Sequence, residues 1–248
     1  MTLEEDIIYF VLPAGAYFLG SIPFAFLIGK AHGVDIRTVG SKNVGATNLG
    51  RTLGMWFFWQ AFLLDAAKGF VPVLVAALLI RHWNELHAAL PDAVYPLPSW
   101  PPLLAGGACL IGHLFPVWLK FRGGKGVATG FGVVLGFWPL FTLAGLAGGL
   151  FFVFMLLVYR FISLASMTGS MVFVAVVAAL GNWKMRPPWM PVETYLPWPQ
   201  LWPLILVAGV FSLLIIIRHR ANIVRLMKGV EPQIRMGRKD VAPGAGGS

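Results

Sequence analysis

The sequence has little charge and almost no cysteine. Only 12% of its 248 residues are Asp, Glu, Lys or Arg, and Cys109 is the single cysteine. One cysteine excludes an intrachain disulfide and a metal site built from cysteines alone. The first residues, MTLEED, are acidic and lack the positive region of a secretory signal. We therefore expect the first apolar run to be retained as a membrane span.

Hydrophobic residues dominate what is present. They make up 58% of the chain, which has a mean hydropathy of +0.76. This composition is typical of polytopic membrane proteins and rare in soluble ones. We therefore relate the net charge of +9 to an anionic membrane surface and not to nucleic acid. The apolar runs cover residues 7–29, 55–80, 103–119, 127–158, 162–181 and 201–217.

The fourth run, 127–158, is too long for one ordinary crossing, and Pro139 near its middle can open a helical hairpin. With seven spans, 15 Lys and Arg fall on one side of the membrane and 3 on the other, whereas six spans put 9 on each side. Cytoplasmic segments carry the excess of Lys and Arg, so this distribution favours seven spans over six. The sequence therefore predicts an all-α polytopic membrane protein. It has seven transmembrane helices, its N-terminus outside and its C-terminus in the cytoplasm. We expect residues 1–236 to form one domain and residues 237–248 to be a disordered tail.

Three glycine-rich, basic patches lie at the ends of apolar runs. The first is VDIRTVGSKNVGATNLGRTLG (34–54), the second is GHLFPVWLKFRGGKGVATG (112–130) and the third is RHRANIVRLMKGVE (218–231). Glycines expose backbone N–H groups, and Arg, Lys, Ser, Thr and Asn supply further donors, so all three patches are suited to anions. The predicted topology places all three on the cytoplasmic side.

The first patch gathers neutral hydrogen-bond donors around one arginine. Ser41, Asn43, Thr47, Asn48 and Arg51 fall within eleven residues. This composition suits a phosphate group with hydroxyls nearby, although a polar loop capping the second span would have the same composition. We predict that Asn43, Thr47 and Asn48 bind substrate.

The second patch resembles a Walker A loop but does not match its pattern. No glycine lies four residues before Gly124, and Lys125 is followed by Gly126 where a Ser or Thr would hold magnesium. A nucleotide triphosphatase is therefore disfavoured. We predict a nest of bare amides from Gly123 to Gly126, with Lys125 as the counter-charge to phosphate. His113, earlier in the patch, binds substrate or only bonds a neighbouring carbonyl group.

The third patch closes the last apolar run. Arg225 and Lys228 fit a membrane anchor near a helix C-terminus. His219 and Asn222 are three residues apart and so share one helix face, a pairing that an anchor does not require. Glu231 is an acidic partner for one of the basic residues of the site.

Other features are less specific. HAALPD (87–92) fits the His-x4-Asp pattern of acyl-CoA-dependent glycerolipid acyltransferases, but the topology places it outside. Asp65 and Lys68, three residues apart in a span, form an intramembrane pair whose role is open. Small-xxx-small pairs such as Gly132/Gly136 predict close helix packing.

From Gly20 to Glu231 the chain closely resembles the bacterial membrane glycerol-3-phosphate acyltransferases that use acyl phosphate. The resemblance rests on three long motifs in order, beginning with GSIPFAFLIGK (20–30) and continuing into the patches. It implies a seven-helix enzyme of the inner membrane with a cytoplasmic active site. The implied reaction moves an acyl group from acyl phosphate to the 1-hydroxyl of glycerol 3-phosphate. The implied products are lysophosphatidic acid and phosphate, in the first acylation of phospholipid synthesis.

The resemblance also implies roles for single residues. It implies catalytic roles for Ser41, Arg51, His219 and Asn222. It implies that Gly123, Gly124 and Gly126 bind acyl phosphate and that Glu231 is structural. One departure is Lys42, which stands where the family pattern has glycine, and this leaves the backbone geometry of the loop open.

The expected chemistry needs neither metal nor cofactor, because an acyl phosphate is already activated. The base is either His219 or the phosphate of the donor, with the donor favoured. Expected partners are the two substrates, membrane lipids and, transiently, the soluble enzyme that makes acyl phosphate. The sequence leaves acyl chain length and oligomeric state open.

Two other functions stay open. A carrier of organic phosphates would also need cytoplasmic basic sites, but no inverted sequence repeat is visible. A CDP-alcohol phosphotransferase would hold metal with several aspartates, and the aspartates here are scattered along the chain.

Overall fold

The computed structural model describes residues 6–87, 100–182 and 196–234, and this part of the chain is helical. The predicted tail at 237–248 and the HAALPD aspartate lie outside the described residues. The elements are η1 (Ile7–Val11), α2 (Leu12–Ser21), α3 (Phe24–Ala31), α4 (Ala46–Leu53), α5 (Met55–His87), α6 (Trp100–Leu114), η2 (Val117–Leu119), α7 (Val127–Gly136), α8 (Leu140–Tyr159), α9 (Ile162–Gly181), α10 (Trp198–Arg218) and α11 (Arg220–Met227).

Six helical stretches among the described residues are long and apolar enough to cross a membrane. They are Ile7–Ala31, Met55–Trp83, Trp100–Leu119, Leu140–Tyr159, Ile162–Gly181 and Trp198–Arg218. Five of them match expected apolar runs to within three residues at each end, whereas Leu140–Tyr159 covers only the second part of the expected run 127–158. An all-helical membrane fold is thereby confirmed.

The predicted run 127–158 is divided, as the position of Pro139 indicated. Helix α7 ends at Gly136 and α8 begins at Leu140, so the break is confirmed. Helix α7 has only ten residues. At 1.5 Å per residue it is about 15 Å long, roughly half the hydrocarbon thickness of a bilayer.

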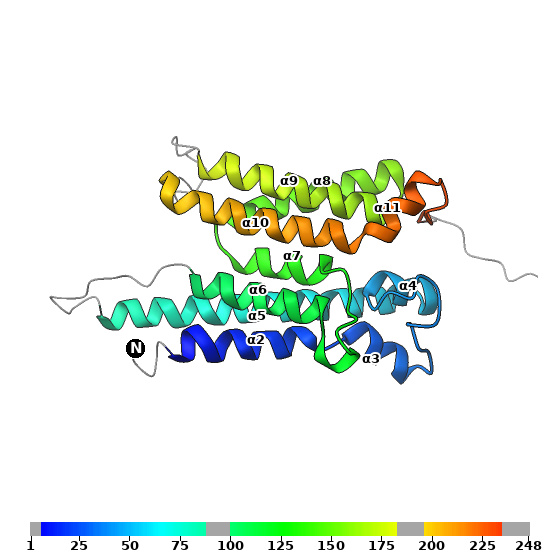
Figure 1. Cartoon of the computed structure of the whole chain (residues 1–248), viewed down its shortest axis with the longest axis horizontal. Helices are drawn as coiled ribbons and strands as arrows, with labels where there is room; N and C mark the ends of the chain where they lie inside the picture. The colour runs from blue at the N-terminus through cyan, green and yellow to red at the C-terminus, as the bar shows by residue number, and fades with distance from the viewer. Residues whose placement is uncertain (1–5, 88–99, 183–195, 235–248) are drawn as a thin grey trace, which may run out of the picture.

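The first run, expected to be one span over 7–29, is also interrupted. Helix α2 ends at Ser21, Ile22 is extended, and α3 starts at Phe24. Pro23 has no N–H to donate, so the helical hydrogen-bond ladder cannot continue through it. The break turns α3 away from the axis of α2 (Figure 1) and directs the chain into the first patch.

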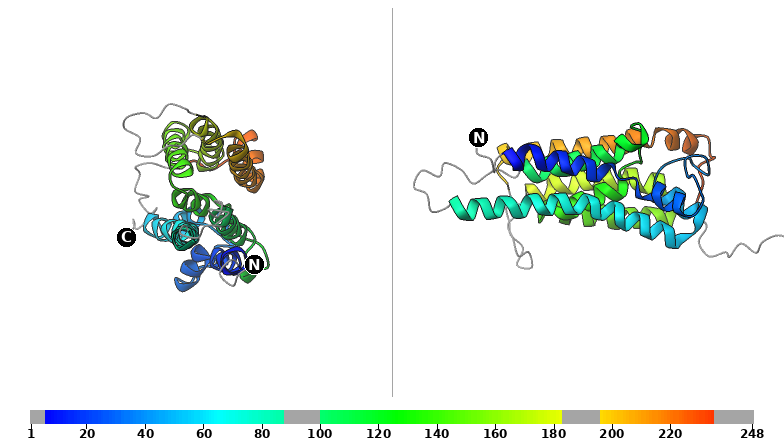
Figure 2. Two further views of the ribbon diagram at one scale, coloured as in Figure 1. Left: turned by 90° about the vertical axis from the view of Figure 1, so that its left-hand side faces the viewer. Right: turned by 90° about the horizontal axis from the view of Figure 1, so that it is seen from below.

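The long helices form two groups, with α7 between them. Helices α8, α9 and α10 pack together, as do α2, α5 and α6, and α7 contacts both α5 and α8. Figure 2, in its end-on view, places α7 between these groups. Helices α3, α4 and α11 lie at the end of the molecule opposite the first residues of α2 (Figure 1). The three patches therefore meet at one end of the bundle.

Close contacts between α5 and α7 depend on glycine. A Cβ atom at Gly132 would overlap the carbonyl oxygen of Ala66, and one at Gly69 would overlap that of Thr129. At Gly136 a Cβ would lie 2.9 Å from Cβ of Val73. The close packing predicted for the Gly132/Gly136 pair is thus confirmed, and α5 is the helix that it meets.

We predict that Gly132→Ala destabilises the protein by about 1–3 kcal/mol, because the added methyl group cannot fit without moving α5. Thermal unfolding in detergent would measure this loss. The matched control is Gly130→Ala in the same helix, where the nearest atom to a new Cβ is 4.0 Å away. Equal stability of the two variants would contradict the prediction.

Candidate functional site

A cavity of about 280 Å³ opens where the three patches meet. All three contribute to its wall. The lining residues are Ser41, Lys42 and Asn43 from the first patch, Lys125 from the second, and Ile217, Arg218, Arg220, Ala221, Asn222 and Arg225 at and beside the third. The structure therefore brings together three patches that the sequence predicted only to share one side of the membrane.

The cavity wall is strongly cationic. Five of its lining residues are Lys or Arg, and none of them is Asp or Glu. Arg220 and Ala221 also open helix α11, where the first N–H groups of a helix have no intrahelical partner. Charge and helix direction both favour an anion with several oxygen atoms, such as a phosphate group.

Asn48 organises the loop of the first patch from inside. Its side chain is fully buried and its amide donates to the carbonyls of Ile36 and Val39 at 2.8 and 3.1 Å. Its Oδ1 accepts the backbone N–H of Ser41 at 2.9 Å. Asn48 was expected to bind substrate, but its side chain forms hydrogen bonds with the backbone of the loop and positions Ser41.

Lys42 follows Ser41 in a left-handed backbone conformation, with φ of +57°. This region favours glycine, because a Cβ crowds the following carbonyl. The structure therefore gives a physical reason for the glycine expected at this position. Here the same backbone carries a lysine that lines the cavity.

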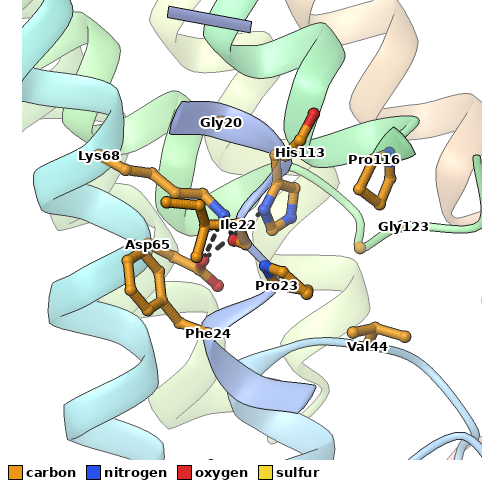
Figure 3. Close-up of a pocket in the computed structure, with 12 residues that line it drawn as sticks. Gly20, Ile22, Pro23, Phe24, Val44, Asp65, Lys68, His113, Pro116 and Gly123 are labelled. Atoms are coloured by element: carbon orange, nitrogen blue, oxygen red, sulfur yellow. Dashed lines mark hydrogen bonds and ion pairs between the residues drawn. The ribbon is translucent and has the colours of Figure 1, made fainter. Parts of the chain in front are cut away.

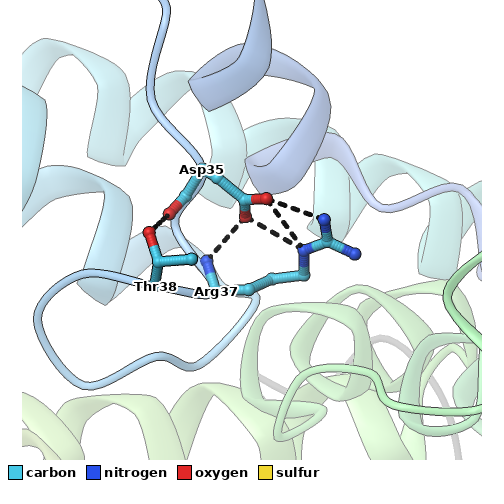
Figure 4. Close-up of polar contacts among 3 residues, drawn as sticks. All are labelled: Asp35, Arg37 and Thr38. Atoms are coloured by element: carbon cyan, nitrogen blue, oxygen red, sulfur yellow. Dashed lines mark hydrogen bonds and ion pairs between the residues drawn. The ribbon is translucent and has the colours of Figure 1, made fainter.

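The start of the first patch is tied by Asp35, as Figure 4 shows. Its carboxylate accepts from the backbone N–H of Arg37 at 3.0 Å and from Nη2 of Arg37 at 2.7 Å. The side-chain hydrogen bond from Arg37 is the main reason that the pKa of Asp35 falls to about 2. The Arg37 guanidinium also lies 4.6 Å from the ring centroid of Phe26 on α3. These contacts fix the chain as it leaves α3.

The glycine loop of the second patch differs from the expected nest. The N–H of Gly123 donates to the carbonyl of Leu114 at 3.2 Å, and the N–H of Gly124 to that of His113 at 3.2 Å. The prediction of bare amides is therefore wrong for these two residues. Both positions need glycine for another reason: a Cβ at either would overlap His113. Gly126, with φ of +83°, ends the loop and begins α7.

Arg218 clamps this loop from the opposite side. Its Nη2 donates to the carbonyl of Gly123 at 2.7 Å and its Nε to that of Gly124 at 3.1 Å. Helix α10 and the glycine loop are thereby joined, although they are far apart in sequence. Arg218 both holds the loop and lines the cavity.

Lys125 is the cation that the glycine loop presents to the cavity. Its Nζ donates to Oδ1 of Asn222, which connects the second patch to the third. Burial is the main reason that the pKa of Lys125 falls to about 8, and nearby arginines lower it further. Lys125 is thus charged at neutral pH and loses its proton in mildly alkaline solution.

Glu231 lies buried behind this wall and holds three side chains. Its Oε1 accepts from Asn222 at 2.6 Å and from Ser163 of α9 at 2.7 Å, and its Oε2 accepts from Arg225 at 2.7 Å. Burial opposes its ionisation, but the hydrogen bonds outweigh it, so the pKa of Glu231 is below the ordinary value. The Glu231 carboxylate thus fixes Asn222, which in turn contacts Lys125.

His219 is buried and is not among the cavity-lining residues. Its Nδ1 lies 2.8 Å from the carbonyl oxygen of Ile215, so Nδ1 carries the proton and Nε2 is left as an acceptor. Burial, followed by the charge of Lys125, lowers the pKa of His219 to about 4. It is therefore neutral at physiological pH and a weak base.

The other predicted residues occupy different places. Arg51 is exposed and its Nη2 donates to the carbonyl of Pro232 at 3.3 Å, which links the first patch to the residue that follows the third. Thr47 is half-buried in α4, and neither it nor Arg51 lines the cavity. His113 is buried and faces Asp65 at the base of the glycine loop (Figure 3).

Sequence reasoning assigned Arg225 to a membrane anchor, and the structure corrects this. Arg225 pairs with Glu231 and lines the cavity. Arg220 lines it as well. A helical wheel places Arg225 three residues after Asn222 on the same face, a signal that was available in the sequence.

Residues 10–229 match the model of a family described as glycerol-3-phosphate acyltransferase. Glycerol-3-phosphate acyltransferase of Geotalea daltonii is 39% identical over 221 residues, which cover 89% of this chain and 95% of that one. The protein of the same name from Anaeromyxobacter dehalogenans is 38% identical over 94% of this chain and 100% of its own length.

Solved structures give the same result. PlsY (YgiH), an integral membrane glycerol 3-phosphate acyltransferase, in its glycerol 3-phosphate form has a TM-score of 0.71 and 36% sequence identity. That comparison covers 91% of this chain and 94% of the other. The lysophosphatidic acid form gives a TM-score of 0.69 and 35% identity.

We predict that the affinity of the cavity for a phosphate monoester is highest between about pH 6 and pH 8. Such a ligand is dianionic above about pH 6, and Lys125 loses its charge as the pH rises through about 8. Above that pH the affinity should fall by up to about tenfold per unit.

Isothermal titration calorimetry across this range would test the pH dependence. Lys125→Arg is the control, because arginine stays charged and should remove the decline above pH 8. A dissociation constant that is constant from pH 7 to pH 10 in the unmodified protein would rule out this role for Lys125.

Proposed function

Because the chain belongs to the glycerol-3-phosphate acyltransferase family and is an integral membrane acyltransferase, we propose a specific reaction for it. The donor is an acyl phosphate, the acceptor is the 1-hydroxyl of glycerol 3-phosphate, and the products are lysophosphatidic acid and inorganic phosphate. The observation that carries this proposal is the cavity itself, with its five cationic lining residues and no carboxylate among them. Donor and acceptor each bring a phosphate group to such a wall.

In this proposal the protein positions two reactants and neutralises charge. The acceptor hydroxyl oxygen attacks the acyl carbon, a new ester C–O bond forms, and the bond from the acyl carbon to the phosphate oxygen breaks. The electron pair of that bond leaves with the phosphate, which Lys125 and Arg218 would stabilise. No side-chain nucleophile is needed, because the phosphate is already a good leaving group.

We assign the proton of the hydroxyl to the phosphate of the donor. His219 is the other candidate, but burial lowers its pKa to about 4, so it is a weak base at neutral pH. His219 is also absent from the residues that line the cavity, which further disfavours it as the base. Ser41 and Asn222 are side chains at the cavity wall that can bond the hydroxyls of glycerol 3-phosphate.

The proposed setting is the inner membrane, with seven spans and the cavity facing the cytoplasm. Helix α7 would be the short additional crossing, and the 15 to 3 distribution of Lys and Arg supports this orientation. The cavity is lined by residues of the loop before α4 and of α11, and these two helices lie at the same end of the bundle (Figure 1). Water-soluble glycerol 3-phosphate would enter from that side.

We expect purified protein to release phosphate and form lysophosphatidic acid with acyl phosphate, and to be inactive with acyl-CoA or acyl carrier protein. Radiolabelled glycerol 3-phosphate and a phosphate assay would measure the two products. Lys125→Ala should reduce turnover strongly, whereas Asn182→Ala, at the far end of α9, is the control expected to remain active. Equal rates with acyl-CoA would contradict the choice of donor.

We expect the basic end to be protected from an impermeant thiol reagent in intact cells. Single cysteines at Arg122 and Lys228, both exposed, would be placed in a Cys109→Ala background. They should react only after permeabilisation, whereas a cysteine at Ala93, in the segment predicted outside, should react directly. Labelling of the first two in intact cells would reverse the proposed orientation.

A further inference from the structure

Three ionisable side chains outside the cavity are buried within the apolar bundle. Asp65 and Lys68 of α5 are 2% and 3% exposed, and His113 at the end of α6 is 8% exposed. Lys68 Nζ lies 2.7 Å from Oδ1 of Asp65. Burying charges is costly even when they are paired, so a buried pair in a membrane helix is a candidate for function. The proposed reaction uses neither residue of this pair.

Lys68 contacts the backbone at the break in the first span. Its Nζ donates to the carbonyl of Ile22 at 2.6 Å, and it lies 5.4 Å from the ring centroid of Phe24. Ile22 follows the last residue of α2 and precedes Pro23, where the interrupted helix leaves carbonyl groups without their usual partners. Lys68 therefore stabilises the bend that directs α3 toward the first patch.

Asp65 faces the base of the glycine loop through His113, as Figure 3 shows. Nδ1 of His113 lies 3.7 Å from Oδ1 of Asp65. The His113 ring packs so closely beneath Gly124 that a Cβ there would overlap its Nε2, and the His113 carbonyl accepts the Gly124 N–H. Lys125 is the next residue. Asp65 is therefore connected to the cationic wall through His113 and then through Gly124, the residue before Lys125.

The space around this cluster excludes a role in binding substrate. The cavity bounded by Asp65, Lys68, His113 and the glycine loop has a volume of about 10 Å³, which leaves room for about one water molecule. Neither glycerol 3-phosphate nor a phosphate group fits there. Lys68 contacts the break that precedes the first patch and His113 contacts the glycine loop, but none of the three residues lines the cationic cavity.

We propose that Asp65 and Lys68 are positioning residues of the acyltransferase site. Lys68 sets the approach of the first patch through Ile22, and Asp65 sets the height of the Gly123–Lys125 loop through the ring of His113. This inference rests on the proposed function. A displacement of about 1 Å at a reacting centre is enough to reduce rates by about 100-fold, so modest loosening of these supports would be visible in turnover.

The test must separate position from folding. Removing one member of a buried pair leaves an uncompensated charge and destabilises the protein, whereas replacing both by apolar residues of similar size is often neutral. The main variant is therefore Asp65→Leu combined with Lys68→Met. The control is Ser170→Ala combined with Ser212→Ala, which removes a hydrogen bond of 2.9 Å between α9 and α10.

Three measurements on full-length protein in detergent are needed: thermal unfolding, steady-state kinetics with acyl phosphate, and calorimetric binding of inorganic phosphate. For the main variant we expect a melting temperature close to that of the unmodified protein and a kcat reduced roughly 10- to 100-fold. We also expect a weaker affinity for phosphate, because Lys125 is displaced. The control should keep its kcat.

A second variant, His113→Gln, keeps a polar side chain near Asp65 but removes the ring beneath Gly124, and we expect a lower kcat without unfolding. A stable main variant with normal kcat would overturn the proposal. The proposal would also be overturned if the main variant failed to fold while the His113→Gln variant was fully active. The Asp65–Lys68 pair would then serve folding alone. If the unmodified protein does not use acyl phosphate, the proposed function fails, and the phosphate-binding arm still tests the positioning role.

Discussion

The arrangement of the basic end of the molecule depends on the contacts of the Glu231 carboxylate. Lys125, Arg218, Arg220 and Arg225 converge there, and like charges at such distances repel one another. Glu231 pairs with Arg225 and also accepts hydrogen bonds from Asn222 and Ser163. It neutralises one of these positive charges from the buried side and leaves the others facing the cavity, so an anion in the cavity reduces the repulsion that remains.

In the same region, some polar side chains hold the loops in place and others face the cavity. Asn48 fills the first loop and positions Ser41, and Arg218 holds the glycine loop by its carbonyls. The side chains that remain at the surface, above all Lys125, are thus presented by loops fixed on both sides. Catalysis by positioning and charge neutralisation requires this rigidity, because flexible donors would have to reorganise in each turnover.

Several features were readable from single residues. The break at Pro139 and the packing of Gly132 follow from local rules, since proline ends a helix and glycine permits close approach. The placement of all three patches on one side of the membrane was predicted from charge alone, whereas their convergence on one cavity is seen only in the structure. The role of Arg225 was misassigned, because an arginine at a helix end satisfies anchor and ion-pair rules equally well. The spacing of three residues from Asn222 pointed to the site, and the ion pair with Glu231 in the structure identifies the role.

The sequence by itself determined the membrane class of this protein, its apolar segments and the three segments that supply positive charge, because hydropathy and charge are sums over residues. The tertiary structure alone decided which donors remain available. The N–H groups of Gly123 and Gly124 are consumed by the carbonyls of Leu114 and His113, and the Asn48 amide is consumed by its own loop. Availability of a hydrogen-bonding group depends on what lies opposite it in space, and packing between segments distant in sequence sets that partner.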